Sequence, residues 1–134
     1  MLDRGLATLT PTTIGDIGWY QYPEGSTADY QKKMYCDGGA DRWLAHVSDG
    51  MVFIKMHELD IPISGFAPAE SEIELFVGDG YTELELQGKY STLKPLMSRY
   101  WTVYWKLVQL PSGIEVKVGN EELVEFIVSH LPSI

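Results

Sequence analysis

The sequence of 134 residues has little of what several protein classes require. Its one cysteine, Cys36, excludes an intramolecular disulfide and a cysteine-rich metal site, and fits a reducing compartment. No apolar run reaches the roughly 18 residues of a membrane span. The N-terminal stretch lacks the continuous apolar core of a signal peptide. We therefore expect a cytoplasmic protein.

Basic residues are also scarce, since 10 Lys and Arg stand against 19 Asp and Glu, for a net charge of −9. An acidic surface repels phosphate backbones and anionic lipid, so neither nucleic acid nor membrane is an expected partner. The same acid excess serves solubility. The sequence has no H-x-H, HExxH or EF-hand pattern. We expect no metal and no cofactor.

What the chain does have is alternation with a period of two, which indicates β-strands. Residues 72–77 and 81–87 alternate on either side of Gly78-Asp79-Gly80, which predicts a hairpin. In its second strand the residues that share the polar face are Tyr81, Glu83, Glu85 and Gln87. Residues 42–57 form a second predicted hairpin around Ser48-Asp49-Gly50.

The remaining elements complete a mostly-β protein. Arg99–Leu110 predicts a long strand, because aromatic and β-branched residues alternate there. Asn120 as an N-cap followed by two glutamates predicts a short helix over residues 121–130. Further short strands are predicted at residues 6–9, 18–22, 34–36 and 114–118. We expect one antiparallel β-sandwich domain over residues 1–134 with a short C-terminal helix.

Glu83 and Glu85 are the most suggestive acidic pair. Two positions apart on a strand, their backbones are about 6.6–7 Å apart on one face. Paired carboxylates near that separation serve acid–base chemistry on sugars, with the pKa of one raised by the other. The alternative is a solvated polar strand face.

The histidines and tyrosines offer weaker signals. His46 and His57 lie on adjacent strands but not opposite each other, so a structural role is the simpler interpretation. Tyr100 and Tyr104 point away from the Trp101 and Trp105 face of the predicted long strand. They either stack on sugar rings or are buried between layers.

Several of these runs resemble a known superfamily over about residues 40–110. They are YTELELQG (81–88), TLKP (92–95), the strand at 101–107 and the hairpin RWLAHVSDGMVFIK (42–55). Together they resemble the C-terminal half of galactose-mutarotase-like proteins, and most closely an uncharacterised bacterial branch, the DUF4380 family. The resemblance implies a bacterial source, half of a β-supersandwich and a sugar-binding-like cleft.

The resemblance also implies a role for Glu85. In mutarotases a glutamate in the matching strand abstracts the proton of the anomeric hydroxyl, so Glu85 is the candidate catalytic residue. Leu86 stands where the family has a proline. The histidine that protonates the ring oxygen belongs to the half that this chain does not match. A complete epimerase site is therefore not expected in one copy.

Carbohydrate binding without catalysis is the expected function. The alternatives are an aldose-epimerase-like enzyme completed by a partner chain, and an interaction module without a small-molecule ligand. The candidate ligand-binding residues are Lys55, His57, Tyr81, Glu83, Gln87 and Tyr104. Both faces of residues 99–108 carry large side chains, more than a strand with one wet face needs, so we expect a homodimer or higher oligomer.

Overall fold

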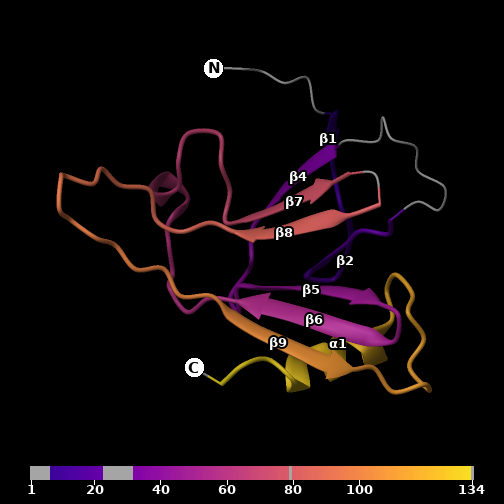
Figure 1. Ribbon diagram of the computed structural model, residues 1–134. Helices are drawn as coiled ribbons and strands as arrows, with labels where there is room; N and C mark the ends of the chain where they lie inside the picture. The colour runs from indigo at the N-terminus through magenta and orange to yellow at the C-terminus, as the bar shows by residue number, and fades with distance from the viewer. Residues whose placement is uncertain (1–6, 23–31, 79, 134) are drawn as a thin grey trace.

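The computed structural model describes residues 7–22, 32–78 and 80–133, without the side chains of residues 7–9. Within these ranges the chain forms three small, mostly antiparallel sheets and one α-helix (Figure 1). Sheet A has the order β1 (Ala7–Leu9), β4 (Lys32–Cys36), β7 (Ile73–Val77), β8 (Thr82–Leu86). Sheet B pairs β2 (Thr12–Ile14) with β3 (Ile17–Trp19). Sheet C has the order β5 (Trp43–Ser48), β6 (Met51–Met56), β9 (Tyr104–Gln109).

These elements confirm the predicted mostly-β class with a short C-terminal helix, α1 (Glu121–Ser129). Only the pairing of β1 with β4 is parallel among the described strand pairs. Sheets A and C lie one above the other as layers of a sandwich, and no barrel closes over the described strands (Figure 1). No helix in the described ranges is long and apolar enough to span a membrane.

Both predicted hairpins are present, and turn chemistry explains the one that joins β5 to β6. Asp49 and Gly50 have φ angles of 51° and 70°, the left-handed conformation that a tight hairpin turn needs. The register then places Ala45 opposite Ile54 and Val47 opposite Val52, so the apolar residues of β5 and β6 share one face.

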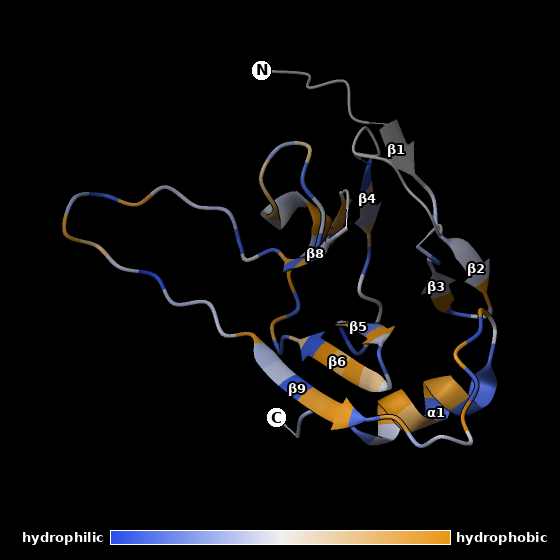
Figure 2. Cartoon of the chain, turned by 45° about the vertical axis from the view of Figure 1, so that its right-hand side comes forward, coloured by the Kyte–Doolittle hydropathy of each residue, from blue (hydrophilic) through white to orange (hydrophobic). Residues whose placement is uncertain are grey.

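The main core lies between that face of sheet C and α1. Val52 and Ile54 are fully buried, and Leu123 and Ile127 of the helix pack on them. Figure 2 shows the hydrophobic stretches of β6, β9 and α1 gathered on this side of the molecule. The Asn120 side chain accepts a hydrogen bond of 3.0 Å from the Glu122 N–H, which caps the helix as predicted.

Sheet A contributes a second apolar face, on which Met34, Ile73 and Val77 are buried. Among the described strands, none pairs with the outer edge of β8. Two side chains cover that edge instead: Lys55 Nζ donates to the Leu84 carbonyl, and Trp101 Nε1 donates to the Leu86 carbonyl at 3.3 Å. Since Lys55 belongs to β6, this contact joins sheet A to sheet C.

Three strand predictions need correction. Residues 99–103 are not a strand, because β6 ends at Met56 opposite Tyr104 and no partner continues beyond it. Residues 114–118 likewise have no partner strand and form an irregular connection before α1. The strand predicted at 18–22 is instead β3, which ends at Trp19.

Candidate functional site

One face of sheet A carries a row of acidic side chains. The antiparallel register places Glu74 of β7 directly opposite Glu85 of β8 and, on its other side, opposite Tyr35 of β4. Phe76 in turn lies opposite Glu83. Directly opposed residues in adjacent strands have neighbouring side chains, so two carboxylates share this part of the face.

Lys33 forms ion pairs with two acids of this row, Glu74 and Glu85. Its Nζ lies 2.6 Å from Glu74 Oε2 and 3.7 Å from Glu85 Oε1. Glu74 is fully buried, and its Oε1 accepts a hydrogen bond of 2.9 Å from the Ser71 N–H. Glu85 is partly exposed, and its Oε2 accepts from Gln87 Nε2 at 3.2 Å. The Glu85 carboxylate is thus fixed from two sides and open on a third.

Burial and crowding of like charges shift the proton affinities of this cluster. Burial raises the pKa of Glu85, the Lys33 ammonium opposes that rise, and the charges of Glu74 and Glu83 add to it. A hydrogen bond to Glu74, with burial, raises the pKa of Glu70 to about 7. Burial alone would raise the pKa of Glu74, but its hydrogen bonds with Glu70 and Lys33 lower it. Of this pair, Glu70 is therefore the group that takes up a proton first as pH falls.

Lys33 stays charged in this setting. Burial would lower its pKa, but its hydrogen bond with Glu74 and the charges of Glu74, Glu85 and Glu70 raise the pKa on balance. Lys33 therefore interacts with three acids, whose carboxyl oxygens are mainly hydrogen-bond acceptors.

A second polar contact lies where β7 begins. His57 is fully buried, its Nε2 lies 3.1 Å from Glu72 Oε1, and the Trp101 ring lies 4.8 Å from its imidazole. Glu72 Oε2 also accepts a hydrogen bond of 2.7 Å from the Gly38 N–H. Burial lowers the pKa of His57, with Glu72 opposing and Arg42 reinforcing the effect. This histidine is a neutral structural residue near neutral pH.

The structure brings only part of the predicted set together. Glu83, Glu85 and Gln87 alternate along β8 and its extension, as the sequence predicts. Tyr81 is about half exposed, and its ring lies 5.8 Å from that of Phe76. His57 contacts Glu72, not Glu85.

Lys55 and Tyr104 lie away from this face. Lys55 reaches the β8 edge, and burial lowers its pKa while Glu85 opposes the shift. Tyr104 lies opposite Met56 in the register, whereas Lys55 lies opposite Trp105, so the two side chains point to opposite faces of sheet C. The Tyr104 hydroxyl is 3.5 Å from Glu58 Oε2.

Sequence reasoning missed Lys33, Glu70, Glu72 and Glu74. Counting outward from Gly78-Asp79-Gly80 would have placed Glu74 opposite Glu85, so a signal for that pair existed. Lys33 is paired to β7 across about 40 intervening residues, and no local pattern indicates that register.

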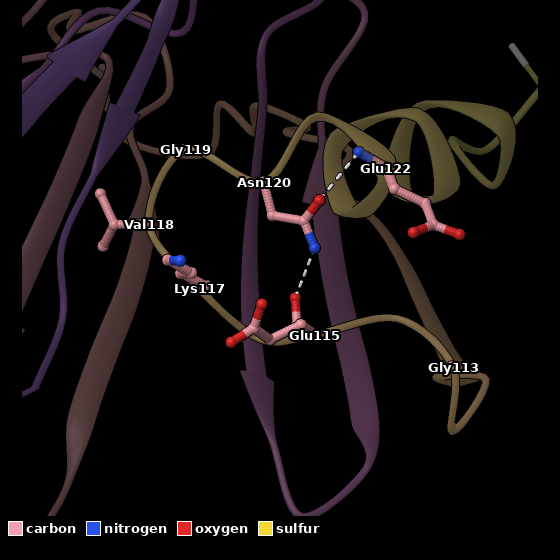
Figure 3. A pocket seen from close by; sticks show the side chains of 7 residues that line it. All are labelled: Gly113, Glu115, Lys117, Val118, Gly119, Asn120 and Glu122. Carbon is pink, nitrogen blue, oxygen red and sulfur yellow. Dashed lines mark hydrogen bonds between the residues drawn. The ribbon is translucent and has the colours of Figure 1, made fainter.

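Two pockets lie outside the acidic row. One, of about 170 Å³, is lined by Leu59, Gly88, Lys89, Arg99, Tyr100 and Trp101. The other, of about 380 Å³, lies beside the N-terminus of α1 (Figure 3). There the Asn120 side-chain amide donates to the Glu115 carbonyl at 2.6 Å. The negative charges of Glu121 and Glu122, in the first turn of α1, interact favourably with the positive end of the helix dipole. Glu85 lines neither pocket.

Among the residues with described side chains, no three His, Cys, Asp or Glu are grouped so that they could hold a metal ion. Comparison of the chain with protein-family models, with curated proteins and with solved structures found no match.

Proposed function

We propose that the chain binds a carbohydrate on the polar face of sheet A, with the Glu85 carboxylate as the central acceptor. The observation that carries this proposal is the fixed, partly open position of Glu85 between Lys33 and Gln87. A carboxylate held this way is ready to accept a hydroxyl hydrogen without first losing side-chain freedom.

The acceptors of this cluster favour a ligand rich in donors. Glu70, Glu74 and Glu85 all interact with Lys33, and acids with perturbed pKa values gathered on one face are typical of functional sites. Sugar hydroxyls donate to carboxylates and accept from ammonium and amide groups. Lys33 and Gln87 supply those two donor types beside Glu85.

Aromatic rings border the same face. Tyr35 lies opposite Glu74 and is 42% exposed, and Lys33 Nζ lies 5.8 Å from the centre of its ring. Tyr81 is 51% exposed beside Phe76. Exposed rings next to fixed polar groups suit the apolar C–H face and polar rim of a sugar.

Binding without turnover fits better than epimerisation. Epimerisation needs, besides a base such as Glu85, a second group placed to protonate the ring oxygen. His57, the nearest candidate by type, is buried beside Glu72 and is not opposite Glu85. We therefore expect no mutarotation above the buffer rate, which polarimetry of glucose and galactose checks.

The test is titration calorimetry with galactose, glucose and their oligosaccharides against wild type and Glu85→Gln. The substitution keeps the shape of the side chain and removes the charge, so we expect sugar affinity to fall by about 1–3 kcal/mol. Glu125→Gln, at an exposed position on α1, is the matched control and should bind as wild type does. Melting curves check that both variants fold.

Two outcomes would contradict the proposal. If none of these sugars binds wild type, carbohydrate is not the ligand. If a sugar binds Glu85→Gln as tightly as wild type, the site lies elsewhere on the chain.

A further inference from the structure

Residues 88–103, here called the arm, project from the body of the molecule between β8 and β9 (Figure 1). The arm has no regular secondary structure. Two contacts fix its base: the Tyr90 N–H donates to the Gly65 carbonyl at 2.8 Å, and the Trp101 indole packs on Gly88, where an added Cβ would meet it at 3.0 Å. Connections this long within a compact domain are usually functional.

The arm exposes apolar side chains that the described part of the chain leaves uncovered. Leu96 is fully exposed at its tip, and Tyr100 is 93% exposed. Leu96 also has a φ of 68°, a left-handed conformation that favours glycine and strains a leucine. A large apolar residue held out in a strained position is expected to contact a partner.

A second exposed segment lies at the same end of the molecule. Residues 58–66, here called the ledge, follow β6 and include the short 3₁₀ helix η1 (Ile63–Gly65). Ile63 is 87% exposed and Leu59 is 49% exposed, while Ile61 and Phe66 are buried and anchor the segment. Of the 14 large hydrophobic side chains that are exposed in the described part of the chain, half lie in the arm or the ledge.

Charge distinguishes the two segments. The arm carries Lys89, Lys94 and Arg99 and no acidic residue, within a chain whose net charge is −9. The ledge carries Glu58 and Asp60 and no basic residue. The Asp60 side chain lies 3.8 Å from Arg42 Nη2 and is still 88% exposed. A basic, apolar arm and an acidic, apolar ledge are therefore complementary surfaces on one molecule.

We propose that the arm of one copy docks on the ledge of a second copy, and that the exchange is reciprocal. Because the arm and the ledge share one end of the molecule, a two-fold axis there brings each arm to the other ledge in a closed dimer. Leu96 and Met97 then pack near Leu59 and Ile63 of the second copy. This inference does not depend on sugar binding.

Sedimentation velocity with charge-reversed variants tests the exchange. The arm variant is Lys94→Glu with Arg99→Glu, and the ledge variant is Glu58→Lys with Asp60→Lys. We expect wild type to dimerise at micromolar to tens of micromolar concentration. Each variant alone should dimerise at least about tenfold more weakly, because like charges then meet at both contacts.

Mixing the two variants gives the decisive measurement. In a mixed pair, the reversed arm meets the reversed ledge and the native arm meets the native ledge, so both contacts are again complementary. We expect the equimolar mixture to regain dimers, which labelling of one variant detects. A dimer formed through any other surface would not show this rescue.

An apolar substitution adds an independent measurement. Leu96→Asp should weaken wild-type dimerisation by at least about tenfold, as loss of a buried anchor does. Leu107→Asp, at a 63% exposed position on β9 outside both segments, is the matched control and should leave the dimer intact. A wild type that stays monomeric, a mixture without rescue, or a Leu96→Asp variant that dimerises like wild type would each overturn the proposal.

Discussion

Lys33 is the residue that allows the Glu74 carboxylate to be buried on sheet A. Glu74 is fully enclosed, and an ionised carboxylate without a nearby cation would cost several kcal/mol there. The 2.6 Å contact with Lys33 Nζ and the Ser71 N–H supply the compensation. The pKa values of two neighbouring acids are raised for different reasons: the hydrogen bond with Glu74 raises that of Glu70, and burial raises that of Glu85.

The Glu70–Glu74 pair predicts a specific pH dependence of stability. The pKa of Glu70 is raised in the folded state to about 7, from an ordinary value of 4.5. A raised pKa means that the stability contributed by this group is present below pH 4.5 and is lost as pH rises through about 7. Glu70→Gln mimics the protonated form, so we expect it to be more stable than wild type at pH 8.

The stability difference between Glu70→Gln and wild type should shrink as pH falls from 8 towards 5. It should stay below about 1 kcal/mol, because Glu70 is largely exposed and solvent screens its charge. Urea titrations of both proteins at several pH values measure the difference, and taking the difference removes contributions that both share, such as that of His57. A stability difference independent of pH would contradict the raised pKa of Glu70.

The candidate site could be predicted only in part from the sequence. Alternation along one strand put Glu83, Glu85 and Gln87 on a common face, because the period of a strand is local. The pairing of Glu85 with Lys33 involves β4, a strand about 50 residues away in sequence. Register between distant strands follows from packing of the whole sheet, which no short motif encodes.

At the level of elements, the Asn120 cap offers a direct test. Its side chain accepts from the Glu122 N–H and donates to the Glu115 carbonyl, so it both begins α1 and holds the preceding connection. Asn120→Ala should cost about 0.5–2 kcal/mol of stability. Asn120→Asp, which keeps the acceptor, should lose less. Denaturant unfolding measures both, and equal losses for the two variants would argue against the cap.

Local turn chemistry explains which elements were predicted correctly. The hairpins around Asp49-Gly50 and around residues 78–80 join strands that are adjacent in sequence, so each strand finds its partner nearby. The strand predicted at 99–110 is correct only for 104–109, because residues 99–103 have no neighbouring strand to pair with. Trp101 has strand-forming neighbours, but its indole leaves the sheet to cover the Leu86 carbonyl and to contact His57.

At the scale of the whole molecule, sheets A and C share no strand. The Lys55 and Trp101 contacts to the β8 edge join them, and the chain crosses between the two sheets in several places. We predicted a single domain, and this joining favours cooperative unfolding of both sheets.

Val77→Ala tests that cooperativity. Val77 is fully buried in sheet A, and removing its two methyl groups should cost about 2 kcal/mol. Trp19 and Trp43 pack against the core of sheet C, so their fluorescence reports on the other half of the molecule. We expect the fluorescence transition and the circular dichroism transition to shift together. A fluorescence transition that stays in place would mean that the sheets unfold as separate domains.

The arm also determines how readily proteases cleave the chain. Trypsin-like enzymes cut after lysine or arginine in extended, accessible backbone, and exposed loop tips are the usual place of nicking. Lys94 is followed by Pro95, which blocks that bond, whereas the Arg99–Tyr100 bond lies in irregular, exposed chain. A cut there would separate β9 and α1 from the remaining strands in sequence, although packing would still hold them. In the dimer proposed above the arm is covered, so such an enzyme would cut free chains faster than paired ones, and the lifetime of the protein would depend on its own concentration.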